Sequence, residues 1–361
     1  RLMTLDRLLI VKLADIGDVL TATPALRALR QTFPSVRLDL LTTPAAAAAA
    51  AAPPSLVDRV WTAPRSLARS PGELPGLWRL LAGLRRQRYN AVLYLHHLTL
   101  GVGVVKYRLL AAATGAPLLL GLDNGKGGWL SHSAPDQGFG AVHEVEYWLQ
   151  VVALLGAQTS SQALHPSYSD ADARAVEPLL AERRPQPLVA IHPGSGGYAP
   201  ARRWEPAKWA GVADELVRRY GAQIVLVGTL ADGAAAVQAA MSTPALNLAG
   251  RTTLPQLAAV LAQCDLFLGA DSGVMHVAAS VAVPLVALFG PSNHLAWGPW
   301  AAEAPAAVVR LGLRCSPCSY VDHSVGARDG CWHRSCMADL QPERVLAAVE
   351  ALGVLDVISD R

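Results

Sequence analysis

The tripeptide Asp-Ser-Gly at residues 271–273 stands between an apolar run and a helical pattern, a position in which it could bind phosphate. The sequence predicts a buried strand at residues 264–270, a helix at 274–282 and a further strand after it. A helix that begins near Ser272 presents free backbone N–H groups to an anion. The segment therefore predicts a nucleotide or phosphate site. The alternative is that Asp271 or Ser272 only caps the helix.

A second acid, Asp18, follows an apolar strand predicted at residues 8–13. Gly17 permits a tight turn into the next helix, predicted at residues 19–33, and leaves Asp18 at the start of that helix. Two interpretations remain open for this carboxylate. It is either the N-cap of the helix or a general base that faces a ligand.

Two further loops carry groups suited to a nucleotide. The loop of residues 192–209 is rich in Gly and Ser and contains Arg202 and Arg203 ahead of a predicted helix. Guanidinium groups beside free backbone N–H groups suit a diphosphate, although a surface loop with ordinary arginines has the same composition. Asp232 follows a strand that ends at Gly228, where an acid can accept hydrogen bonds from ribose hydroxyls.

Four of the five cysteines form one cluster near the C-terminus, at Cys315, Cys318, Cys331 and Cys336. In a cytosolic protein this spacing predicts a structural zinc or iron site, and free thiols or a disulfide pair are the alternatives. The fifth, Cys264, lies in an apolar strand and is predicted to be a small core residue.

Strands and helices alternate along the whole chain, which predicts an α/β fold with parallel sheets. Both halves open with a strand, a glycine-bearing loop and a helix. We therefore predict two doubly wound domains that face each other across a cleft, an N-terminal domain at residues 1–165 and a C-terminal domain at 166–361. The loops at Asp18, Ser195, Gly228 and Ser272 are expected to line that cleft, because ligands bind at the carboxyl ends of parallel strands.

Composition narrows the class of protein. The chain has 361 residues, of which 52% are hydrophobic and 16% charged, so it can bury two cores. The net charge is only +3, and no long Lys/Arg run is present, which argues against nucleic acid as a partner. No apolar run is long enough to span a membrane, and no cleavage-site pattern follows the N-terminal apolar run, so we expect a cytoplasmic protein.

The motifs LLIVKLADIGDVLTATPALRALR, IHPGSGGYAPARRWEPAKW and LGADSGVMHVAASVAVPLVALFGPSN occur in this order between about residues 8 and 352. Together they resemble glycosyltransferase family 9, the bacterial heptosyltransferases. The resemblance implies a GT-B architecture of two Rossmann-like domains, with the acceptor bound by the first and the donor nucleotide by the second. It also implies transfer of a sugar, typically heptose from ADP-heptose, with inversion at the anomeric carbon.

The resemblance also assigns roles to single residues. Asp18 matches the family's catalytic aspartate, and His143 is placed near the acceptor, where a purely structural histidine is the alternative. The donor site corresponds to Gly194, Ser195, Arg202, Asp232, Asp271, Ser272, Gly273 and His276. Arg202 stands where some members have lysine, a change that keeps the charge but not the geometry.

The expected reaction needs no covalent intermediate. Asp18 accepts the proton of the attacking hydroxyl, and the helix near Ser272 with Arg202 stabilises the leaving diphosphate, so no metal is expected for catalysis. The expected partners are a nucleotide-sugar donor, a glycan or lipid-linked acceptor and the inner membrane surface. A non-catalytic nucleotide-sugar-binding module and a GT-B-type epimerase are the alternative functions.

Overall fold

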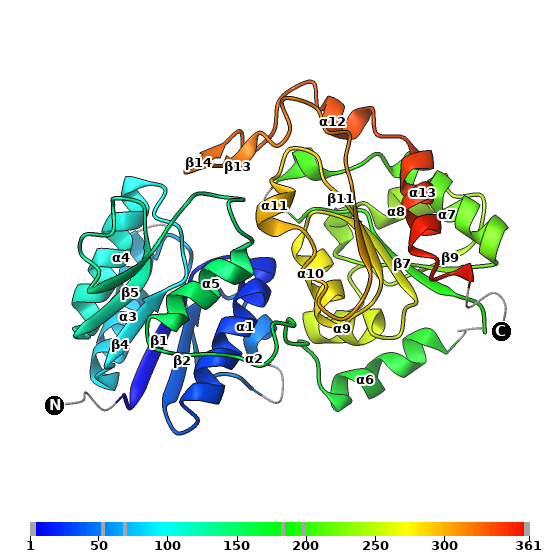
Figure 1. Cartoon of the computed structure of the whole chain (residues 1–361). Coiled ribbons are helices and arrows are strands. Elements are labelled where there is room, and N and C mark those ends of the chain that lie inside the picture. The colour runs from blue at the N-terminus through cyan, green and yellow to red at the C-terminus, as the bar shows by residue number, and fades with distance from the viewer. Residues whose placement is uncertain (1–4, 52–54, 68–70, 182–184, 197–198, 357–361) are drawn as a thin grey trace. The chain divides into compact units, whose positions relative to one another are not determined.

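The computed structural model describes residues 5–51, 55–67, 71–181, 185–196 and 199–356, and divides into two units. The first unit comprises Arg1–Gln162 and Asp322–Ser324, and the second comprises Ala163–Val321 and Val325–Arg361. Each unit is built on one six-stranded sheet (Figure 1). The predicted α/β class is therefore confirmed.

The sheet of the first unit is parallel throughout and has the order β3-β2-β1-β4-β5-β6. Its strands are β1 (Arg7–Lys12), β2 (Arg37–Thr42), β3 (Arg59–Thr62), β4 (Ala91–Tyr94), β5 (Leu118–Asp123) and β6 (His132–Pro135). The α-helices of this unit are α1 (Ile16–Thr32), α2 (Ala48–Ala51), α3 (Leu74–Gln87), α4 (Gly101–Thr114) and α5 (Glu144–Ala153).

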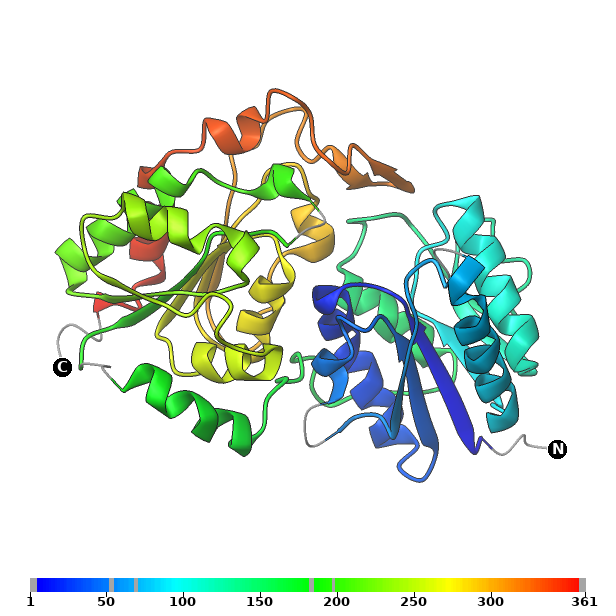
Figure 2. The ribbon, with the colours of Figure 1, turned by 180° about the vertical axis from the view of Figure 1, so that it is seen from behind.

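Helices cover both faces of this sheet, which explains why its central strands are apolar without alternation. The apolar side chains of α3 and α4 share a core with Leu9, Val11 and Val92. The other face is covered by α1 and α5, which pack against each other (Figures 1 and 2). All of Leu8–Val11 and Ala91–Tyr94 are buried as a result.

The sheet of the second unit is also parallel and has the order β12-β11-β10-β7-β8-β9. Its strands are β7 (Leu188–His192), β8 (Gln223–Leu226), β9 (Ala245–Asn247), β10 (Leu266–Ala270), β11 (Leu285–Leu288) and β12 (Ala306–Val309). Its α-helices are α6 (Asp170–Val176), α7 (Pro206–Tyr220), α8 (Ala234–Ala240), α9 (Leu254–Leu261), α10 (Gly273–Ser280), α11 (His294–Trp297), α12 (Ser335–Ala338) and α13 (Pro342–Leu352). A short hairpin consists of β13 (Ser319–Val321) and β14 (Ser324–Gly326).

Both sheets have the same strand order when the strands are ranked along the chain: third, second, first, fourth, fifth, sixth. This is the order of doubly wound nucleotide-binding folds, whose ligands bind beside the carboxyl ends of the first and fourth strands. The switch point lies between β1 and β4 in the first unit and between β7 and β10 in the second. These two edges are therefore the places to look for chemistry.

Within the described part of the chain, none of the helices combines the length and the apolar character needed to cross a bilayer.

Candidate active site

Asp18 lies in the first turn of α1, directly after β1. The helix begins at Ile16, three residues before the predicted start, because Asp15 rather than Asp18 is the N-cap. The Asp15 N–H donates a hydrogen bond to Asp18 Oδ2 over 3.2 Å. The side chain of Asp18 remains 27% exposed, so it can still meet a ligand at the switch point.

A buried lysine lies next to this carboxylate. Lys12 is the last residue of β1, and its Nζ lies 4.0 Å from Asp18 Oδ1 and 3.8 Å from the centre of the Trp148 ring. Burial lowers the pKa of Lys12, while the negative charges of Asp18 and Glu144 oppose that shift. The electron-rich face of Trp148 adds a further attraction for the ammonium group. The sequence-based site did not include Lys12, because a single lysine in an apolar strand has no motif around it.

His96 connects the two strands at the switch point. Leu13, just after β1, donates its backbone N–H to His96 Nε2, which follows β4, over 2.8 Å. Burial and the nearby Lys12 hold the pKa of His96 well below its usual range. The ring is therefore neutral, and it fixes the loop that carries the acid.

A second histidine, His97, is held between two buried carboxyl groups. Its Nδ1 lies 3.0 Å from Asp136 and its Nε2 2.9 Å from Glu144, and its side chain is only 5% exposed. Burial alone would lower the pKa of His97, but Glu144 and Asp136 outweigh it and raise the pKa to about 9. Asn124 also donates to Asp136, over 3.2 Å. This network attaches α5, and with it Trp148, to the switch point.

The His97 network predicts a pH-dependent stability. The folded pKa of about 9 exceeds the ordinary value of 6.5, so the stabilisation is complete below about pH 6.5 and is lost as the pH rises through about 9. We expect His97→Gln to lower the free energy of unfolding by about 3 kcal/mol near pH 6 and by much less above pH 9, as measured by urea denaturation. The exposed His132 offers a control, since His132→Gln should change little at either pH. A pH-independent loss for His97→Gln would show that the histidine acts through packing alone.

In the second unit, a histidine that was not predicted connects three of the predicted donor-site regions. His192 ends β7, and its Nδ1 lies 3.2 Å from Ser272 Oγ, while its Nε2 lies 3.4 Å from Asp232 Oδ2. Burial would raise the pKa of Asp232, but His192 and Thr229 outweigh it and lower that pKa. Asp232 Oδ1 is buried and has no hydrogen-bond partner among the described residues. It is therefore available to accept from a ligand hydroxyl.

Two glycines leave room for this arrangement. A Cβ at Gly194 would lie 2.1 Å from Asp232 Oδ1. A Cβ at Gly228 would lie 2.8 Å from the His192 ring, and the φ of +123° there also favours glycine. Any larger residue at either position would push the carboxylate or the imidazole away.

The predicted Arg202 and Asp271 form an ion pair, with Nη1 and Oδ2 2.9 Å apart. The side chains are 14% and 5% exposed, so the pair is largely desolvated. Arg202 Nε is buried and has no hydrogen-bond partner among the described residues. The guanidinium group thus pairs with Asp271 and still has its Nε–H available to donate a hydrogen bond to a ligand.

Helix α10 starts one residue before the predicted position, with Ser272 as its N-cap and Gly273 as its first residue. Ser272 Oγ accepts a hydrogen bond from the Met275 N–H over 3.4 Å, so the prediction that Ser272 caps the helix is confirmed. Phosphate binding at this position stays a prediction. His276 is buried one turn further along. Ser195, by contrast, donates its hydroxyl to Ala199 O within its own loop, over 2.8 Å.

His143 caps α5, because its Nδ1 accepts a hydrogen bond from the Val145 N–H over 3.2 Å. This hydrogen bond supports the interpretation that His143 has a purely structural role. A contact with the acceptor stays a prediction.

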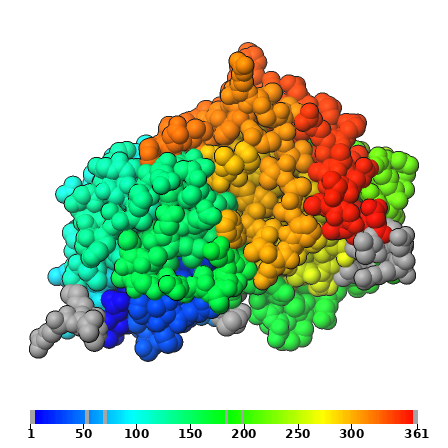
Figure 3. Space-filling model, viewed as in Figure 1, coloured from blue at the N-terminus to red at the C-terminus, as the bar shows by residue number. Residues whose placement is uncertain are grey.

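The four clustered cysteines are free thiols at or near the surface, on a segment drawn in orange to red in Figure 3. Burial raises the pKa values of Cys318 and Cys336, and the neighbouring thiols of the cluster raise them further. In the part of the chain that the structure describes, no group of three or more His, Cys, Asp or Glu side chains has the arrangement of a metal site. The metal therefore stays a prediction.

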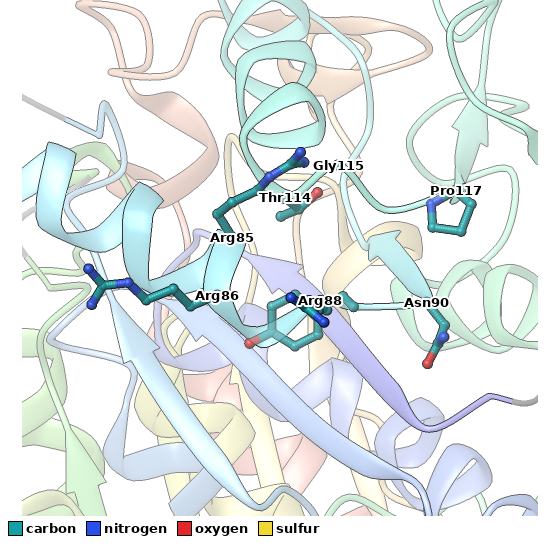
Figure 4. Close-up of a pocket in the computed structure, with 8 residues that line it drawn as sticks. Arg85, Arg86, Arg88, Asn90, Thr114, Gly115 and Pro117 are labelled. Carbon is teal, nitrogen blue, oxygen red and sulfur yellow. The ribbon is translucent and has the colours of Figure 1, made fainter.

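A cavity of about 610 Å³ lies away from both switch points. It is lined by residues just before β4 and β5 and by the ends of α3 and α4: Arg85, Arg86, Arg88, Tyr89, Asn90, Thr114, Gly115 and Pro117 (Figure 4). These positions are at the amino ends of the strands, opposite the edge that carries Asp18. The cavity is not part of the candidate active site.

Two doubly wound sheets in the order of nucleotide-binding folds, one with an acid and the other with a capped helix and an arginine at its switch point, define a GT-B-like fold of the glycosyltransferase type. Residues 77–326 match the family described as glycosyltransferase family 9 (heptosyltransferase). The chain belongs to glycosyltransferase family 9.

Individual relatives agree with this assignment. Lipopolysaccharide heptosyltransferase 3 of Escherichia coli is 27% identical over 296 residues, 79% of this chain and 83% of the relative. The structure of E. coli ADP-heptose lipopolysaccharide heptosyltransferase II has a TM-score of 0.72 at 23% identity and covers 96% and 98% of the two chains. The iron-containing dodecameric glycosyltransferase TibC from enterotoxigenic E. coli has a TM-score of 0.59 at 12% identity, with 98% and 77% covered. The last two likenesses concern the fold.

Proposed function

We propose that this glycosyltransferase moves a heptose from ADP-heptose to a hydroxyl of a lipopolysaccharide-type acceptor, with inversion at the anomeric carbon. The proposal is supported by family membership and by the names of the relatives, which are heptosyltransferases of lipopolysaccharide. The observation that carries the mechanism is the position of Asp18, a partly exposed acid beside a buried cation at a switch point.

In the proposed step, Asp18 accepts the proton of the acceptor hydroxyl as the oxygen attacks the anomeric carbon. The new carbon–oxygen bond forms while the bond to the diphosphate breaks, and the electron pair leaves with ADP. Lys12 pairs with Asp18 Oδ1, and the Asp15 N–H binds Oδ2, so the carboxylate is oriented before the substrate arrives.

The second unit is proposed to bind the donor. Arg202 and the N-terminus of α10, at Ser272 and Gly273, stabilise the negative charge that builds on the diphosphate. Asp232 Oδ1 accepts from a ribose hydroxyl, and Gly194 lets the backbone approach the nucleotide. Because protein groups meet the diphosphate charge, the proposal assigns no metal to catalysis.

The experiment that tests this function follows ADP release from a panel of nucleotide sugars, with and without a heptose-deficient lipopolysaccharide core. The proposal requires ADP release that depends on both ADP-heptose and the acceptor. Conversion of the donor to another sugar without acceptor would identify an epimerase. Binding without any turnover would identify a binding module.

The four-cysteine cluster is proposed to hold a structural zinc or iron ion. Thiolates are the ligands that both metals accept, and four of them leave no open position for a substrate. The structural neighbour described as iron-containing is a precedent for iron in this fold, although it is only 12% identical.

We therefore expect protein purified without added metal to contain close to one zinc or iron per chain by elemental analysis. The Cys315→Ser and Cys318→Ser double variant should lose the metal and part of its thermal stability. Cys264→Ser is the matched control, since that buried thiol lies just after α9, outside the cluster, and donates to Val260 O. Metal-free native protein with four freely titratable thiols would contradict the proposal.

A further inference from the structure

The outer surface of α3 and α4 is apolar, although it faces away from the core. Six of the ten strongly exposed large apolar side chains among the described residues lie between Leu74 and Leu109. They are Leu74, Trp78, Leu100, Val102, Val105 and Leu109. Trp78 is 70% exposed and Val102 83%. We refer to these six residues as the α3–α4 face.

The spacing of these residues shows that they form one surface. Val102, Val105 and Leu109 recur at intervals of three and four residues, so they lie along one side of α4. Leu74 and Trp78 are likewise four residues apart on α3. The two helices pack side by side (Figure 2). Each helix therefore carries a second apolar side besides the one that is buried against the sheet. Packing of the core explains the apolar residues of the buried side but not those of the exposed side.

The charged residues within the two helices have one sign, although Glu73, the exposed N-cap of α3, places an acid beside Leu74. Neither helix contains an acidic residue, and together they carry Arg79, Arg85, Arg86, Lys106 and Arg108. Figure 4 shows Arg85 reaching toward Thr114 and Gly115, while Arg86 points away to the other side of α3. Arg88 follows at the end of α3 and extends the basic region into the arginine-lined cavity.

We propose that the α3–α4 face docks on an anionic phospholipid bilayer. Trp78 and the aliphatic side chains would enter the headgroup boundary, and the arginines would bind the lipid phosphates. A protein partner is disfavoured because exposed valines and leucines beside a rim in which basic side chains outnumber Glu73 match the chemistry of a lipid surface, whose phosphates lie beside its hydrocarbon. The charge complementarity of this face selects the anionic bilayer as its occupant.

The face is tied to the acid of the active site. Lys106 on α4 donates to Arg65 O over 2.9 Å, and the Arg65 guanidinium pairs with Asp15 over 2.7 Å, three residues before Asp18. Both α3 and α4 begin at the carboxyl edge of the sheet, the edge that carries Asp18. A docked face would therefore hold this edge close to a lipid-linked acceptor. That advantage rests on the proposed function. The docking itself does not depend on the proposed function.

Vesicle binding tests the proposal without any reference to catalysis. The full chain is mixed with phosphatidylcholine vesicles that contain or lack phosphatidylglycerol, and the bound fraction is measured by flotation. We expect binding to the anionic vesicles that weakens with salt. The Trp78→Ser and Val102→Ser double variant should bind about tenfold more weakly. The Arg79→Gln, Arg86→Gln and Arg108→Gln triple variant should lose about tenfold or more, and only on the anionic vesicles.

Matched controls lie on the second unit. Leu230→Ser and Trp332→Ser remove side chains that are 84% and 90% exposed, and Arg218→Gln with Arg219→Gln removes two helical arginines. These variants should bind vesicles as the parent chain does. Equal loss in test and control variants, or no vesicle binding by the parent, would overturn the proposal. So would sedimentation showing that the α3–α4 face instead pairs two copies of the chain. If the parent chain bound vesicles but showed no transfer activity, that result would count against the proposed function alone.

Discussion

Asp18→Asn is expected to lower kcat by a factor of about 10²–10⁴, the range for a lost general base, with donor affinity almost unchanged. Asparagine fills the same space and can still accept the hydrogen bond from the Asp15 N–H, so the first turn of α1 should survive. The amide cannot take up a proton from the attacking hydroxyl. Turnover assays and calorimetry with ADP, run on the same preparation, separate the two effects.

Asp15→Asn is the matched control for this experiment. Asp15 lies three residues away in the same turn, is exposed and pairs with Arg65, and asparagine is as good an N-cap as aspartate. We expect the control to keep near-normal turnover. A similar rate loss in both variants would place the effect in the turn, and a near-normal rate for Asp18→Asn would remove Asp18 from the reaction.

Arg202→Gln is expected to weaken ADP binding by about 1–3 kcal/mol, because a charge-assisted contact to the diphosphate is lost. It should also lower the free energy of unfolding by about 3 kcal/mol, since Asp271 is left buried without its cation. Calorimetry with ADP and urea denaturation measure the two losses separately. Arg218→Gln on the exposed side of α7 is the control, and it should change both quantities little.

Adding Asp271→Asn to Arg202→Gln distinguishes a binding role from a structural one. The double variant has no uncompensated charge, so most of the stability should return while ADP affinity stays low. If affinity returned together with stability, the role of Arg202 would be to neutralise the charge of Asp271 and not to bind the diphosphate.

The architecture could be predicted because each central strand is a short apolar run followed by a glycine-bearing or capping turn. The apolar runs at residues 8–13 and 264–270 predict β1 and β10 in this way. The structure confirms both strands, although β10 begins at Leu266. The predicted start of α1, at residue 19, was wrong by three residues. Asp15 and Asp18 are both acceptable caps by residue type, and only the backbone of Asp15 decides between them.

The residues that surround the predicted site could not be predicted. His192, Lys12 and His97 lie at or just beyond strand ends, where a single polar residue has no periodicity to mark it. Their roles depend on partners from 6 to 136 residues away in the chain, such as Asp18 and Trp148 for Lys12 and Ser272 for His192. The α3–α4 face was missed for a different reason: an apolar residue in a helix is expected to point to the core, and sequence alone does not show which side is left exposed.

The most direct test of the account is transfer of labelled heptose from ADP-heptose to a heptose-deficient lipopolysaccharide core. Mass spectrometry of the acceptor detects the added sugar, and NMR of the product gives the configuration at the new anomeric centre. We expect an acceptor heavier by one heptose, with the anomeric configuration opposite to that of the donor, and no such product from Asp18→Asn in the same time. Retention of configuration, or a heptosylated product formed equally well without the Asp18 carboxylate, would contradict it.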